Sequence, residues 1–97
     1  MSDQVKKFQE ECVTATELFA EKNRLYGNAI VETGVLGAVV ELVGITARLK
    51  QMVIRSSDAG ASQADKLEDI LMDAHNYVNI ARMMLREGNY RGRYDNG

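Results

Sequence analysis

The chain of 97 residues contains no proline and no tryptophan, and it has one cysteine, one histidine and two phenylalanines. Without proline, helices can run uninterrupted over many turns. The single cysteine, Cys12, excludes a disulfide within the chain and therefore a secreted, disulfide-held framework. The single histidine, His75, has no cysteine near it in the sequence, so the ligand spacing of a zinc site is missing.

A basic character is also missing, because the formal net charge is −2. Non-specific binding to nucleic acid depends on a field of positive charge, so we expect no nucleic-acid partner. The N-terminal residues lack the apolar stretch of a signal peptide. The most apolar window, residues 30–49, contains Glu32, Glu41 and Arg48, which a membrane span would normally exclude. We therefore expect a cytoplasmic protein, with this window forming a buried helix.

Apolar residues recur at helical spacing in three segments, and 45% of the chain is hydrophobic. The pattern predicts helices over about 3–24, 33–55 and 63–87. The fold class is therefore all-α, with three main helices forming an antiparallel bundle. We expect residues 1–88 to form a single helical domain and residues 89–97, which contain Arg and Tyr but no periodicity, to form a flexible tail.

The second predicted helix is apolar around more than half of its circumference. Such a helix needs cover on more than one side, and a chain of this length has few other elements to supply it. We therefore expect homo-oligomerisation, as a homodimer or a homotetramer, to complete the bundle.

Acidic and amide side chains form a stripe along the third predicted helix, at spacings of four, four and three residues: Asp65, Asp69, Asp73 and Asn76. Like charges at this spacing repel unless a cation lies among them, and oxygen ligands of this kind suit Mg²⁺. If the second and third helices pack antiparallel, Glu41 would face this stripe. We therefore predict a metal site of Glu41, Asp65, Asp69 and Asp73.

A simpler interpretation of the stripe also stands. Negative charges near the start of a helix complement the helix dipole, and this accounts for Asp65. It accounts poorly for Asp73 and Asn76, which lie beyond the first turns. The site interpretation is therefore preferred.

The end of the first predicted helix carries two cations and an aromatic ring, at Lys22, Arg24 and Tyr26. Lysine and arginine contact phosphate oxygens, and tyrosine can stack on a base or bond a ribose hydroxyl. These residues are candidates for nucleotide binding. Cations before a glycine stop are equally typical of an ordinary helix C-terminus, so this signal is weak by itself.

Three segments together resemble the nucleotide modification associated domain 1 family, which is frequent in phages and similar to the MazG-like all-α nucleoside triphosphate pyrophosphohydrolases. The segments are FAEKNRLYGNAI at 19–30, RLKQM at 48–52 and DKLEDILMDAHNYVNIA at 65–81. The resemblance covers roughly residues 5–85. Asp69 and Asp73 match the paired aspartates of the family's third helix, and Asp65 stands where an acid commonly precedes them.

The resemblance implies a helical oligomer in which acidic residues hold Mg²⁺ and the metal binds the phosphates of a nucleotide. It implies hydrolysis of a phosphoanhydride, with Glu41, Asp69 and Asp73 as catalytic residues. Lys22, Tyr26 and Gly27 match the family's first-helix element, and Arg48 matches the arginine late in its second helix. We expect Lys22, Arg24, Tyr26, Arg48 and Asn76 to bind the nucleotide.

The chain departs from the MazG-like pattern at the second helix. There the family has two acids three residues apart, whereas Glu41 is followed at that spacing by Gly44. Unless Glu32 or a partner subunit supplies the missing acid, the metal site is incomplete. The alternative function is therefore a non-catalytic nucleotide-binding protein, such as a phage protein that sequesters a linear or cyclic nucleotide signal.

Overall fold

The computed structural model describes residues 3–26, 29–56 and 64–92, and these residues form three helices and no strand. The helices are α1 (Asp3–Tyr26), α2 (Ala29–Ser56) and α3 (Ala64–Arg86). The predicted all-α class is confirmed. Residues 57–63, between the second and third helices, and residues 93–97 of the predicted tail lie outside the described residues.

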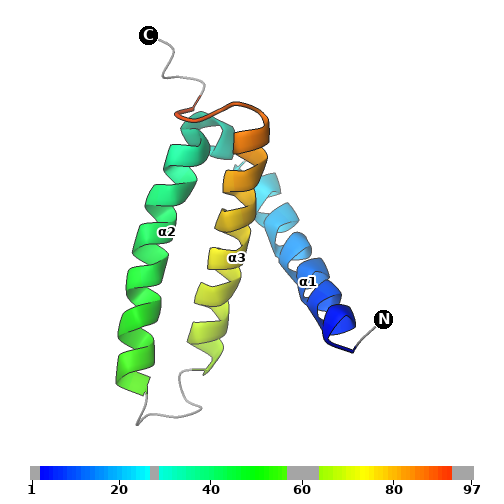
Figure 1. Ribbon diagram of the computed structural model, residues 1–97, viewed down its shortest axis with the longest axis vertical. Coiled ribbons are helices and arrows are strands. Elements are labelled where there is room, and N and C mark those ends of the chain that lie inside the picture. Colours follow the sequence, from blue (N-terminus) through cyan, green and yellow to red (C-terminus); the bar gives the residue numbers. More distant parts are fainter. Residues whose placement is uncertain (1–2, 27–28, 57–63, 93–97) are drawn as a thin grey trace.

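Helices α2 and α3 form an antiparallel pair that makes most of the tertiary contact, whereas α1 meets α3 over part of its length and then diverges (Figure 1). The centre of the pair is a small cluster of buried side chains, Ala38, Ile80 and Met84. Residues from all three helices pack around it, including Phe19, Val35 and Tyr77. The core is therefore located where the three helices come together.

Helix α2 begins four residues earlier than the periodicity predicts and is kinked at Gly34 (φ 64°, ψ −155°). This backbone conformation is essentially restricted to glycine. A methyl carbon at Gly34 would also lie 2.6 Å from the carbonyl oxygen of Asn89. The glycine is therefore required both by its own backbone angles and by a chain segment that comes from beyond α3.

Helix α3 ends in a Schellman motif, in which Gly88 takes a positive φ of 70°. The amide of Gly88 donates to the carbonyl of Leu85 (3.1 Å), and the amide of Asn89 donates to the carbonyl of Met84 (2.9 Å). This turn directs the chain back across the start of α2. The sequence predicted the end of this helix near residue 87, but not the path of the residues that follow.

Residues 89–92, here called the C-terminal hook, are bonded to the kinked part of α2. The amides of Val35 and Leu36 donate to the carbonyls of Asn89 (3.0 Å) and Tyr90 (2.8 Å). The Asn89 side-chain amide donates to the carbonyl of Val31 (2.7 Å). We predicted that the helical domain ends at residue 88, whereas this network continues four residues further.

Helix α2 is also long and apolar enough to cross a membrane, by length and composition alone. This is a weak indication, because the core helix of a soluble protein has the same properties. Many large apolar side chains of α2 are exposed in this single chain, among them Leu36, Val40 and Val43. The cytoplasmic location remains a prediction.

Candidate functional site

An ion pair joins α1 to α3 at the place where the three helices meet. Lys22 Nζ lies 3.0 Å from Asp73 Oδ1, and both side chains are partly exposed. One turn further along α3, the side-chain amide of Asn76 donates to the backbone carbonyl of Ala15 in α1 (3.3 Å). Two of the residues predicted from the α3 stripe therefore bind α1, and one of them binds the lysine predicted to contact phosphate.

Tyr77 lies between acidic side chains from two helices. Burial raises the pKa of the Tyr77 hydroxyl, the negative charges of Glu41 on α2 and Asp73 on α3 raise it further, and Lys22 lowers it. Tyr77 lines one cavity together with Glu41 and another together with Asp73 and Lys22. Glu41 on α2 and Asp73 of the α3 stripe thus both act on the Tyr77 hydroxyl, and their shared metal site stays a prediction.

Two cavities adjoin at this ring. The smaller one, about 300 Å³, is lined by Phe19, Lys22, Asn23, Asp73 and Asn76, among others. The larger one, about 540 Å³, contains Glu32, Thr33, Glu41 and Arg91 in its lining. Four residues line both cavities: Ala29, Ile30, Tyr77 and Ile80. We call the two cavities together the Tyr77 groove.

The other predicted residues lie outside this groove. Asp65, Asp69 and Arg48 are exposed, and none of them lines either cavity. Arg24 donates to both carboxylate oxygens of Glu21 within its own helix turn (2.6 and 2.7 Å). The side chain of Tyr26, like Gly27, lies outside the described residues.

The full four-carboxylate metal site is not assembled within one chain. Over residues 3–26, 29–56 and 64–92, no three His, Cys, Asp or Glu side chains come together in a group that could hold a metal ion. Glu41 and Asp73 do share the surroundings of Tyr77. Mg²⁺ is usually bound by one or two carboxylates together with substrate phosphates, so this pair suits a magnesium–nucleotide complex better than a free ion.

Sequence reasoning missed Arg91 as a residue of the groove. The C-terminal hook carries it there: Gly92 N donates to Asn89 Oδ1 (2.8 Å), which closes the hook, and Arg91 lines the larger cavity. No ion pair of Arg91 is present among the described residues. The sequence showed a tail with arginines, but nothing in its spacing indicated that residues 89–92 return to α2.

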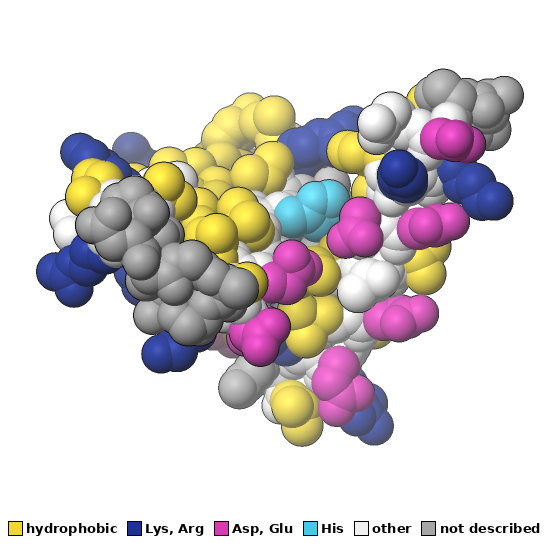
Figure 2. Space-filling view, turned by 90° about the horizontal axis from the view of Figure 1, so that it is seen from below, with side chains coloured by type: hydrophobic (Ala, Val, Ile, Leu, Met, Phe, Trp, Pro, Cys, Tyr) yellow, Lys and Arg dark blue, Asp and Glu magenta, His cyan; other side chains and the backbone are white. Residues whose placement is uncertain are grey.

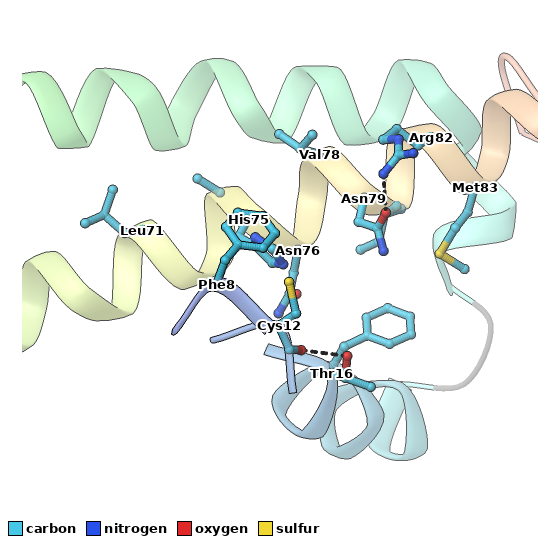
Figure 3. A pocket seen from close by; sticks show the side chains of 13 residues that line it. Phe8, Cys12, Thr16, Leu71, His75, Asn76, Val78, Asn79, Arg82 and Met83 are labelled. Atoms are coloured by element: carbon cyan, nitrogen blue, oxygen red, sulfur yellow. Dashed lines mark hydrogen bonds between the residues drawn. The ribbon is translucent and has the colours of Figure 1, made fainter. Parts of the chain in front are cut away.

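A separate cleft of about 660 Å³ lies between α1 and α3. Phe8 and Cys12 from α1 and His75, Asn76 and Val78 from α3 are among its lining residues (Figure 3). Hydrophobic side chains gather beside the histidine on this side of the molecule, while acidic side chains follow the arm formed by α1 (Figure 2). This cleft is mainly apolar and shares only Asn76 with the predicted site residues.

Comparisons with known proteins assign no family to the chain. No protein-family model matches the chain, and neither a curated protein nor a solved structure matches it. The resemblance described above is therefore carried by the residues of the three segments alone.

Proposed function

We propose that this chain is a nucleotide-binding protein and that the Tyr77 groove holds the ligand. The observation that supports this most is the meeting of Lys22, Asp73, Asn76 and Tyr77 at the junction of three helices, around adjoining cavities. A cation, an amide, a carboxylate and an aromatic ring beside apolar walls are the groups that a nucleotide requires.

The side chains of the smaller cavity suit different parts of a nucleotide. Lys22 provides a partly exposed ammonium group, which can exchange its bond to Asp73 for bonds to phosphate oxygens. Phe19, Ile30 and Ile80 form an apolar wall of the smaller cavity. A base or sugar would pack there against Tyr77, while the phosphates extend toward the cations.

Magnesium fits this site as a companion of the phosphates. Glu41 and Asp73 would hold it, one carboxylate from each of two facing helices. When bound, it would neutralise phosphate charge, as the MazG-like resemblance implies for hydrolysis of a phosphoanhydride. Asp73 would then leave Lys22, which frees the lysine for the ligand.

Binding without turnover is the second candidate, and one observation favours it. Asp69, which the resemblance makes catalytic, is exposed on α3 and lines neither cavity of the groove. A groove that has cations and a ring but few carboxylates can retain a nucleotide without cleaving it. Such a protein would suit the sequestration of a linear or cyclic nucleotide signal.

A thermal-shift panel separates these functions. Nucleoside mono-, di- and triphosphates and cyclic dinucleotides are each tested with magnesium and with EDTA, because a ligand of the native state raises the melting temperature by mass action. Stabilisation by a triphosphate only with magnesium supports the hydrolase, and product analysis follows. Stabilisation that persists in EDTA supports the non-catalytic protein. If no nucleotide raises the melting temperature, nucleotide binding is wrong.

The position of the ligand is tested by two variants of neighbouring cations on α1. Lys22→Ala removes a charged contact, so we expect nucleotide affinity to fall about 10- to 100-fold. Arg24→Ala is the matched control, because Arg24 pairs with Glu21 and does not line the groove. Equal loss in both variants would show a general charge effect and contradict this placement of the phosphates.

A further inference from the structure

The C-terminal hook carries a cation, Arg91, to the Tyr77 groove. The hook crosses from the end of α3 to the kinked part of α2 (Figure 1), and Arg91 lines the larger cavity there. Within the described part of the chain, no other lysine or arginine lines this cavity, and Arg91 has no carboxylate partner. Its guanidinium group, which carries five N–H donors, therefore remains for a ligand.

The backbone on both sides of Arg91 is bonded in place. On one side, the carbonyl of Tyr90 accepts a hydrogen bond from the amide of Leu36 in α2 (2.8 Å). On the other side, the amide of Gly92 donates to Asn89 Oδ1 (2.8 Å). The position of Arg91 in the larger cavity is therefore set by the bonds of its neighbours in the chain.

Gly92 allows the hook to approach α2 closely. Its φ is 95°, a conformation that favours glycine. A methyl carbon at Gly92 would clash with the backbone carbonyl of Glu32 in α2. Gly34 meets the hook in the same way from the side of α2, so the two segments approach each other through a glycine in each.

The charges of the larger cavity suit a phosphate that arrives with a metal ion. Glu32 and Glu41 line the cavity together with Arg91, and neither acid has an ion pair among residues 3–26, 29–56 and 64–92. Two carboxylates repel a bare phosphate but attract its magnesium complex. Arginine, in turn, binds phosphate oxygens with two parallel N–H donors.

The two cations of the groove lie in different cavities. Lys22 lines the smaller cavity and not the larger one, whereas Arg91 lines the larger cavity and not the smaller one. Tyr77 forms part of both walls. A nucleotide with a single phosphate at Lys22 would therefore leave Arg91 without a contact, and a second phosphate group is needed to reach it.

We propose that Arg91 binds a phosphate of the ligand and that the groove thereby selects nucleotides with at least two phosphate groups. This inference rests on the nucleotide-binding function proposed above. The hook holds Arg91 at the larger cavity, so Asn89 and Gly92 are positioning residues for this contact.

Calorimetric titration with magnesium tests the role of Arg91. A nucleoside monophosphate and the triphosphate of the same base are each titrated into the wild-type chain and into Arg91→Ala. We expect the affinity for the triphosphate to fall about 10- to 100-fold in Arg91→Ala and the affinity for the monophosphate to stay the same. Arg91→Lys retains the charge and should recover part of the lost affinity.

Arg86→Ala is the matched control, because Arg86 is exposed at the end of α3 and lines neither cavity. It should bind both nucleotides as the wild-type chain does. Equal triphosphate affinity in Arg91→Ala and the wild-type chain would overturn this inference and leave the proposed function standing. An equal loss for the monophosphate would overturn the selection by phosphate number. A wild-type chain that binds no nucleotide would reject the function and the inference together.

A cyclic dinucleotide also carries two phosphate groups, and it separates the two sources of the second phosphate. If the ligand is of this kind, the loss in Arg91→Ala appears with the cyclic dinucleotide and the triphosphate does not bind. If the ligand is a nucleoside triphosphate, the reverse is expected. A cyclic dinucleotide that binds both chains equally, without triphosphate binding, would overturn the role of Arg91.

The role of the hook is tested by a double-mutant cycle. Gly92→Ala should displace the hook and weaken triphosphate binding as Arg91→Ala does. In the Arg91→Ala background, Gly92→Ala should change the affinity little further, because the contact that it disturbs is already absent. An equal loss from Gly92→Ala in both backgrounds would mean that Gly92 acts on the groove in another way, and this would contradict the positioning of Arg91 by the hook.

Discussion

At the scale of single residues, the groove depends on the surroundings of Tyr77. Its hydroxyl is desolvated by burial and lies near the carboxylates of Glu41 and Asp73, while Lys22 offsets part of their effect. The pKa of the Tyr77 hydroxyl therefore responds both to the acidic and to the basic side chains of the site. The chemistry proposed for the groove requires these four side chains to act together.

The raised pKa of Tyr77 predicts a loss of stability at alkaline pH. Tyrosine ionises in the unfolded chain near pH 10, and in the folded chain at higher pH. The stability that Tyr77 contributes is therefore present below about pH 10 and is lost as the pH rises through the folded-state pKa. We expect urea denaturation in metal-free buffer to show this fall, and Tyr77→Phe to reduce it.

The matched control for this titration is Tyr90→Phe. The Tyr90 ring is exposed and lines neither cavity of the groove, so this variant should retain the alkaline fall of the wild-type chain. An alkaline fall of the same size in Tyr77→Phe and in the wild-type chain would mean that Tyr77 is not the group responsible.

At the scale of elements, the kink in α2 is held by a segment distant in the sequence. The amides of Val35 and Leu36, the first after the kink, donate to carbonyls of the C-terminal hook. Gly34 provides both the backbone angles and the space that this close approach needs. The hook also keeps Arg91 at the groove.

Gly34→Ala is expected to destabilise the chain. A side chain at this backbone conformation costs about 1–3 kcal/mol, and the clash with Asn89 adds to the cost. Gly44→Ala is the control, because a methyl group there meets no atom within 4 Å and replaces a helical glycine, which favours stability by about 0.5–1 kcal/mol.

Both glycine substitutions are measured by urea denaturation of the full chain at one fixed protein concentration. A free energy of unfolding that is unchanged by Gly34→Ala would contradict the described hook.

The three helices could be predicted from the sequence because their apolar spacing is a local property. The kink could not be predicted, since the angles of Gly34 depend on Asn89, which is 55 residues later. In the same way, the four-residue spacing from Asp69 to Asp73 could not tell which aspartate faces the groove. That choice depends on how α1 crosses α3, and the ion pair with Lys22 places Asp73 there.

At the scale of the whole molecule, one chain leaves many of its large apolar side chains exposed. The described core contains five buried apolar residues, while many large apolar side chains remain exposed on all three helices. Exposed apolar area of this kind on a small domain is typical of an interaction surface. We expect the homo-oligomer predicted from the sequence to cover part of this apolar area.

The most direct test of nucleotide binding is a calorimetric titration of the most stabilising nucleotide into the wild-type chain, Lys22→Ala and Arg24→Ala. We predict one ligand per Tyr77 groove in the wild-type chain, the same affinity in Arg24→Ala, and an affinity about 10- to 100-fold lower in Lys22→Ala. Equal affinity in all three chains would place the ligand elsewhere, and no heat of binding to the wild-type chain would contradict the function itself.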